Sequence, residues 1–197
     1  MQRKVGRFDH PESFSLFFTD WIRLLQTYVF PKHVVQFDVR RINEAATLRE
    51  FGKANESVWP TIDMATLTEL VQQRYIRTHV LGCTSTEDRE FVQDRVKYAT
   101  DYLRVAVGVS PASVIGLTDL NSFESGLSPD LSSNPFAQRQ LRFSAALTLL
   151  YQIRCNLFHG VKGFRNSSKR DILLTSIGVR ILQDIIHALQ RREKEDA

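Results

Sequence analysis

The sequence predicts an all-α protein, a single-domain helical bundle of about five to six helices over residues 1–197. Apolar residues recur at intervals of three and four along most of the chain, which is the period of an amphipathic helix. No pair of alternating segments joined by a hairpin turn suggests a sheet. With 197 residues, of which 43% are hydrophobic, the chain is long enough to bury one core without disulfides. Helices packed on helices are therefore the economical architecture.

The first expected helix covers residues 12–30 and ends at Pro31. Its large apolar side chains follow helical spacing and include Phe14, Phe17, Phe18, Trp21, Leu24, Leu25 and Tyr28. We expect these aromatic rings to fill the core rather than to form a platform for stacked bases. Residues 31–41 alternate like a strand, but without a visible partner strand we interpret them as a connector.

Three further helices are expected in the middle of the chain. A short one covers residues 43–55, and a longer one runs over residues 61–82 and ends near Gly82. The next, over residues 87–107, is capped by Ser85 or Thr86 and ends at Gly108. Its apolar stripe consists of Phe91, Val92, Val96, Ala99, Leu103 and Val107.

Residues 108–135 are expected to form a long loop. They contain three glycines, three prolines and seven serines, which break the helical period. Long loops within compact domains are either binding segments and lids or simply disordered. Two helices follow, one over residues 136–158 and a last one from Ser168 to Arg192, which opens with Ser168 and Asp171 at capping-box spacing.

Composition limits the cellular setting. Cys83 and Cys155 are the only cysteines, so neither a disulfide framework nor a four-cysteine zinc site is expected. The sequence shows no cleavable leader pattern and no run of 18 uninterrupted apolar residues, so we expect a cytoplasmic protein that does not span a membrane. The net charge of +4 only weakly favours a polyanionic partner.

Arg154 is the most unusual residue of the fifth helix. It belongs to an apolar stripe whose members are spaced four and three apart, namely Phe143, Leu147, Leu150, Arg154 and Leu157. An unpaired charge buried there costs about 3 to 5 kcal/mol, so Arg154 must be paired or must face a cleft or another subunit. Glu69 and Asp101 are candidate partners for a purely structural ion pair.

Other chemically useful residues cluster just after Arg154. His159 follows five positions later, about 140° around a helix, and Gly160 is suited to end the helix there. Asn156 lies three positions before His159 and shares its side of the helix. A basic run without acidic residues follows, made of Lys162, Arg165, Lys169 and Arg170, and we expect it to contact an RNA backbone.

The segment RCNLFHG, from Arg154 to Gly160, resembles the arginine, four residues, histidine motif of the HEPN superfamily, whose helical bundles include many metal-independent ribonucleases. The resemblance is specific over about a dozen residues. It implies catalytic roles for Arg154 and His159 and a helper role for Asn156. Many active members carry the polar residue directly after the arginine, where this chain has Cys155. The resemblance also implies a homodimer in which two motifs share one cleft, and a toxin or antiviral setting with an antitoxin or regulatory partner.

The chemistry of these residue types agrees with that activity. Histidine transfers protons near neutral pH, and arginine holds phosphate oxygens with parallel donors. Such cleavage needs no cofactor and no metal, and the remaining histidines show no zinc-ligand spacing. The alternatives are that His159 only stabilises a helix end, or that the fold is a non-catalytic dimer that binds RNA, a nucleotide or a partner protein. Cys155 is expected to pack in the core rather than to act as a nucleophile.

Overall fold

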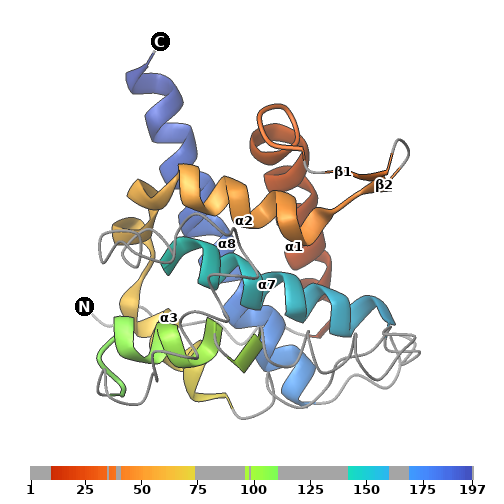
Figure 1. Ribbon diagram of the computed structural model, residues 1–197. Helices are drawn as coiled ribbons and strands as arrows, with labels where there is room; N and C mark the ends of the chain where they lie inside the picture. The colour runs from red at the N-terminus through yellow and green to blue at the C-terminus, as the bar shows by residue number, and fades with distance from the viewer. Residues whose placement is uncertain are drawn as a thin grey trace.

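The computed structural model describes residues 10–34, 36–38, 41–73, 96–97, 99–110, 142–159 and 169–196. These residues are almost entirely helical, which confirms the all-α class (Figure 1). For a few of them, including Phe158, His159 and Arg170, only the backbone is described. The elements in chain order are α1 (His10–Arg23), η1 (Leu24–Val29), β1 (Gln36–Asp38), β2 (Arg41–Ile42), α2 (Glu44–Ala54), η2 (Glu56–Thr61), α3 (Met64–Gln72), α7 (Arg142–His159) and α8 (Lys169–Glu195).

The first helix forms where the aromatic spacing predicts it. Helix α1 passes directly into η1, a π-helical segment, and Pro31 lies in the turn that follows. The backbone N–H of Phe30 donates to the carbonyl of Leu25 at 2.9 Å, which is the wider hydrogen bond of a π-helix. The side chains of Phe14, Phe17 and Trp21 are buried, as expected for core residues.

The interpretation of residues 31–41 as a connector is wrong. Strand β1 pairs antiparallel with β2, and the register places Gln36 opposite Ile42 and Asp38 opposite Arg41. The partner strand was not visible in the sequence because β2 is only two residues long, too short to show a pattern of its own. The ribbon leads into Asn43, whose side chain caps α2 by accepting from the N–H of Ala46 at 3.0 Å.

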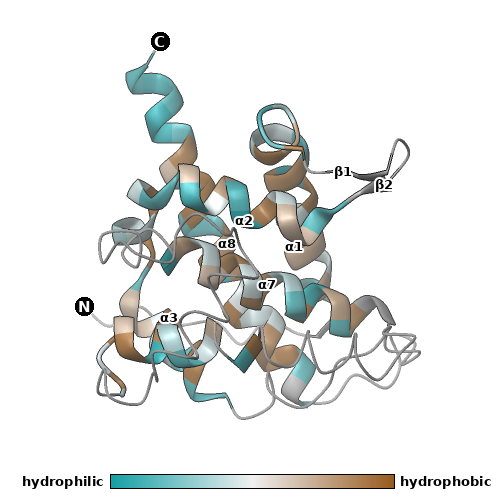
Figure 2. Ribbon diagram, viewed as in Figure 1, coloured by the Kyte–Doolittle hydropathy of each residue, from teal (hydrophilic) through white to brown (hydrophobic). Residues whose placement is uncertain are grey.

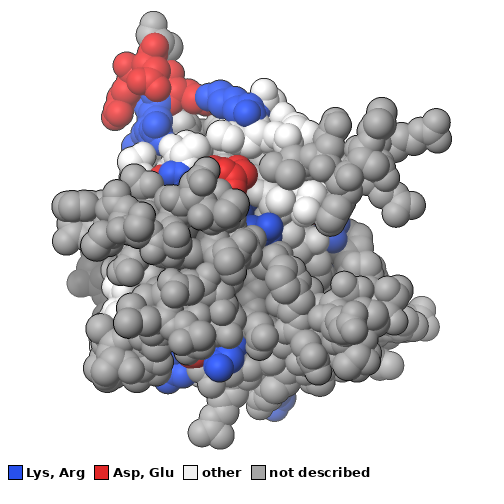
Figure 3. All heavy atoms as spheres, in the orientation of Figure 1, with Lys and Arg blue, Asp and Glu red and all other residues white. Residues whose placement is uncertain are grey.

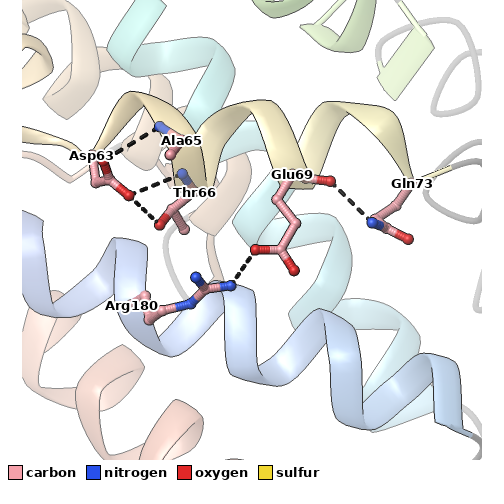
Figure 4. Close-up of polar contacts among 6 residues, drawn as sticks. All are labelled: Asp63, Ala65, Thr66, Glu69, Gln73 and Arg180. Atoms are coloured by element: carbon pink, nitrogen blue, oxygen red, sulfur yellow. Dashed lines mark hydrogen bonds and ion pairs between the residues drawn. The ribbon is translucent and has the colours of Figure 1, made fainter. Parts of the chain in front are cut away.

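Helix α3 begins at Met64, three residues after the expected start, and ends earlier than expected. Asp63 accepts hydrogen bonds from the N–H groups of Ala65 and Thr66 (Figure 4). The helix was predicted to continue to Gly82, and this prediction is wrong because the backbone is already extended at Gln73, with a φ of −70° and a ψ of 113°. The Gln73 side-chain amide donates to the carbonyl of Glu69 at 3.1 Å and so replaces a backbone donor of the next helical turn. Residues 74–95 lie outside the described part of the chain.

The helix before the expected loop ends at Gly108. Residues 96–97 and 99–106 are helical, and Val96, Ala99 and Leu103 of the predicted stripe are buried. Gly108 has a φ of +75°. The N–H of Val109 donates to the carbonyl of Arg104 at 2.7 Å, which completes a glycine-based C-terminal cap. The rest of the 108–135 loop, from residue 111 onward, lies outside the described residues, as does the predicted start of the fifth helix before residue 142.

The long helices pack in two pairs around one core. Helix α1 packs along α8 and α2 packs along α7 (Figure 1). Glycines permit the close crossings: a Cβ atom on Gly178 would lie 2.5 Å from the Phe17 ring, and one on Gly52 would lie 2.7 Å from the Cα of Ser144. Apolar residues line the helix sides that face one another (Figure 2). The largest fully buried side chains are Trp21, Phe17, Phe51, Phe143, Leu24, Leu48, Ile62, Leu67, Leu70, Leu103 and Leu147.

Among the described helices, only α8 has the length and apolar composition that a membrane span requires. The segment concerned is Asp171–Glu195. A buried core helix can have the same length and composition, and 61% of the apolar window of α8 is buried within the fold. The absence of a membrane span therefore stays a prediction. The end of α8 projects from the body and carries exposed acidic and basic side chains (Figures 1 and 3).

Candidate functional site

The apolar stripe of α7 reaches the surface near Arg154. Phe143, Leu147 and Leu150 are fully buried, whereas the Arg154 side chain is 24% exposed. Leu157, one turn further on, is half-buried against the core. The charge therefore lies at the border between core and solvent, and not in the middle of the core.

Glu44 forms an ion pair with Arg154. Its Oε2 atom lies 3.5 Å from Nη2 of Arg154, and its side chain is 19% exposed. This separation is that of an ion pair at the long limit of a hydrogen bond. The two partners proposed from the sequence were Glu69 and Asp101. Glu69 instead binds Arg180 on α8 (Figure 4).

Sequence reasoning missed Glu44 because its only visible role is that of an acidic residue in the first turn of α2. The packing of α2 along α7 brings that turn to the exposed end of the stripe. Residues 110 positions apart in the sequence thus meet, and no local pattern indicates it.

A buried tryptophan holds the second oxygen of Glu44. The indole Nε1 of Trp21 donates to Oε1 of Glu44 at 3.1 Å. Trp21 is only 2% exposed, and its ring lies against those of Phe17 and Tyr151, with centroid distances of 6.1 and 6.4 Å. The carboxylate therefore connects α1, α2 and α7, and its orientation is set by a rigid aromatic cluster.

Tyr151 and Cys155 lie beside this ion pair on α7. Burial raises the pKa of the Cys155 thiol, although its hydrogen bond with Tyr151 and the charge of Arg154 act in the opposite direction. Burial also raises the pKa of the Tyr151 hydroxyl, and the neighbouring Cys155 adds to the increase. Both groups are therefore neutral at neutral pH. A protonated thiol is a poor nucleophile, which agrees with a packing role for Cys155.

Asn156 does not lie with Arg154. Residues two apart on a helix are about 200° apart around its axis. The Oδ1 atom of Asn156 accepts a hydrogen bond from Nε2 of Gln152 at 2.8 Å, and this partner was not anticipated from the sequence. The structure thus assigns Arg154 and Asn156 to different sides of α7.

His159 is the last residue of α7, and only its backbone is described. Because α7 is helical through His159, the position of His159 lies about 140° around the helix axis from that of Arg154 and about 7.5 Å further along the axis. Asn156 precedes it by three residues and shares its side of the helix. Gly160, the expected end of the helix, lies outside the described residues.

The basic run is described only at its end. Lys162 and Arg165 lie outside the described residues, the Lys169 side chain is exposed at the start of α8, and only the backbone of Arg170 is described. Among the described side chains, no group of three His, Cys, Asp or Glu residues is arranged to hold a metal ion.

The site consists of two parts on the terminal turns of α7. One part is the ion pair of Arg154 with Glu44, and the other is the side that carries Asn156 and His159. Family models, curated proteins and solved structures were compared with the chain, and none of them matches it.

Proposed function

We propose that the protein is a metal-independent endoribonuclease of the HEPN type. It cleaves RNA by attack of a 2′-hydroxyl on the adjacent phosphate and leaves a 2′,3′-cyclic phosphate and a 5′-hydroxyl. The observation that carries the proposal is an arginine at the surface end of an apolar stripe, held by a carboxylate, five residues before a histidine that ends the same helix.

Arg154 is the proposed phosphate-binding group. A guanidinium has five N–H donors in a planar fork, and Arg154 lies at the border between the core and solvent with 24% of its side chain exposed. Phosphate oxygens bind such a fork through parallel donors, and the charge stabilises the negative charge that develops in the transition state. Partial burial strengthens that interaction because less water screens it.

His159 is the proposed proton-transfer group, and Asn156 is proposed to orient it or the substrate. Cleavage requires one proton to leave the 2′-hydroxyl and another to reach the 5′-oxygen, so a single histidine serves poorly for both. A homodimer that joins two copies of α7 at one cleft supplies two His159 and two Arg154 side chains. It also removes the difficulty that the positions of Arg154 and His159 lie on different sides of α7 within one chain.

The proposal extends to the surroundings of this cleft. Lys162, Arg165, Lys169 and Arg170 follow the motif in the sequence and are proposed to contact the RNA backbone. A ribonuclease of this kind in the cytoplasm needs restraint, so we propose a toxin or antiviral defence setting with an antitoxin or regulatory partner.

One observation favours a second candidate function. The Arg154–Glu44 ion pair partly neutralises the arginine, and Asn156 binds Gln152 on another side of the helix. These contacts fit a non-catalytic helical dimer that binds RNA, a nucleotide or a protein partner through the same surface. Stable RNA binding without cleavage by the wild-type protein distinguishes this candidate from the nuclease.

The experiment is an RNA cleavage assay in EDTA with paired variants. The wild-type protein is expected to cleave, and His159→Ala and Arg154→Ala are each expected to lose about 100-fold or more of the rate. His187→Ala and Arg191→Ala are matched controls, because they make the same changes of residue type at exposed positions on another helix, α8. Cleavage by His159→Ala at the wild-type rate overturns the assignment.

A further inference from the structure

Glu44 contacts two residues with different requirements. One oxygen accepts from the Trp21 indole at 3.1 Å, and the other lies 3.5 Å from the Arg154 guanidinium. Trp21 needs only an acceptor, because a buried indole N–H without one is costly. Arg154 needs a negative charge. A residue that served Trp21 alone would not have to be ionised.

We propose that Glu44 is a positioning residue for Arg154: it holds the guanidinium in the orientation that binds the scissile phosphate and acts as the counter-ion with which that phosphate competes. The inference rests on the proposed ribonuclease function. Neither the spacing of the motif nor its resemblance to a family indicates this residue, which lies on α2.

The orientation of Glu44 is well defined. Trp21 is 2% exposed and packs against the rings of both Phe17 and Tyr151, so the indole N–H has little freedom to move. Glu44 itself is fixed at the start of α2, directly after the capping residue Asn43. A flexible arginine loses much rotamer entropy when it becomes ordered, and a carboxylate held on a rigid support removes part of that cost before RNA binds.

The negative charge has the opposite effect on affinity. A carboxylate at 3.5 Å from the guanidinium weakens the attraction of that group for a phosphate. Glu44 should therefore raise the rate of the chemical step while it lowers the affinity for RNA. A purely structural contact would not change the rate and the affinity in opposite directions, because its loss reduces the fraction of folded protein without tightening substrate binding.

Glu44→Gln separates the two roles. The amide oxygen still accepts from Trp21, but the charge that orients Arg154 is lost. We expect kcat per folded molecule to fall about 10- to 100-fold as the arginine loses its orientation. We expect KM, and the Kd for RNA measured in a His159→Ala background, to fall about two- to fivefold.

Glu50→Gln is the matched control. Glu50 also lies on α2 and is paired with a cation, Lys53, at 2.8 Å, so this variant makes the same change of charge on the same helix. It should leave kcat and KM unchanged. Trp21→Phe is a second test: it removes the donor but keeps the carboxylate charge, so kcat should fall without tighter RNA binding.

The wild-type rate in the same assay separates this proposal from the proposed function. If the wild-type protein does not cleave RNA, the ribonuclease proposal fails, and this inference fails with it. If the wild-type protein cleaves, then an unchanged kcat in Glu44→Gln, or a lower kcat with KM unchanged or raised, overturns the positioning role alone. A lower kcat together with a lower KM supports it.

Discussion

The carboxylate of Glu44 on α2 lies 3.5 Å from the guanidinium of Arg154 on α7, and the indole of Trp21 on α1 binds its other oxygen. Three helices thus meet at one ion pair, at the point where the core of the protein reaches solvent. The ion pair explains how a charge is tolerated on an apolar stripe. It also identifies the part of the fold on which the proposed chemistry depends.

The first prediction concerns the energy of this ion pair. Glu44→Ala is expected to lower the free energy of unfolding by about 1 to 2 kcal/mol, because it removes a partner from both Arg154 and Trp21. A double-mutant cycle with Arg154→Ala should give a coupling of about 1 kcal/mol by denaturant unfolding. The same cycle on the pair Lys53 and Glu50 should give a coupling of about 0.3 kcal/mol, because the Glu50 side chain is 44% exposed. Equal couplings in both cycles would contradict the special role of Glu44.

The second prediction tests the crossing of α2 with α7. A methyl group on Gly52 would lie 2.7 Å from the Cα and 2.9 Å from the backbone N of Ser144, so the helices must move apart. Gly52→Ala should therefore lower stability by about 1 to 3 kcal/mol, despite the better helix propensity of alanine. Because this crossing positions Glu44 against Arg154, cleavage per folded molecule should fall as well.

Gly108→Ala provides the comparison for that variant. At Gly108 a Cβ atom meets nothing within 4 Å, but φ is +75°. The cost should be about 1 to 2 kcal/mol from backbone strain alone, with no loss of activity per folded molecule. If cleavage per folded molecule falls equally in Gly52→Ala and Gly108→Ala, the geometry of the crossing does not control activity.

The third prediction concerns pH and the cap of α3. The hydrogen bond from Thr66 is the main cause that holds the pKa of Asp63 below its usual value of 3.8. A lowered pKa in the folded state means that the stabilisation is present above 3.8 and is lost as the pH falls through the folded-state pKa.

Asp63→Ala should accordingly cost about 1 kcal/mol at neutral pH and progressively less as the pH falls below 3.8 and through the folded-state pKa. Asp63→Asn, which retains a capping oxygen without a titrating group, should show little change over the same range. Denaturant unfolding across this pH range provides the measurement. A cost of Asp63→Ala that is independent of pH would exclude the ionised cap.

The fourth prediction concerns the dimer. If two copies of the motif share one cleft, a mixture of Arg154→Ala and His159→Ala proteins contains heterodimers with one intact arginine and one intact histidine in that cleft. Such a mixture should cleave RNA faster than either variant alone, and sedimentation should show a dimer. Activity of the mixture equal to the average of the two variants, in proteins shown to exchange subunits, would mean that the motifs do not cooperate.

Much of the fold follows from local pattern, and most of the site does not. The spacing of Phe14, Phe17 and Trp21 predicts both a helix and its buried face, and Gly108 ends its helix as predicted. The two short strands were missed because pairing, rather than alternation, defines them. The early end of α3 was missed because Gln73 replaces a backbone hydrogen bond with one from its own side chain, an event that no breaker residue indicates.

At the site, too, local pattern predicts some features and not others. The position of Arg154 on the stripe predicts that it needs a partner, and it has one. The identity of that partner depends on how α2 packs along α7, which sequence spacing does not specify. Asn156 was expected to share its side of the helix with His159, and helix geometry together with its hydrogen bond to Gln152 separates it from Arg154.

The chemistry of the cleaved ends tests the central claim most directly. RNA incubated with wild-type protein in EDTA should yield 2′,3′-cyclic phosphate and 5′-hydroxyl ends, and RNA with 2′-O-methyl groups at every position should stay intact. His159→Ala should yield neither product, whereas His187→Ala should match the wild type. Cleavage that leaves 3′-hydroxyl and 5′-phosphate ends, or that proceeds on 2′-O-methyl RNA, would contradict the account.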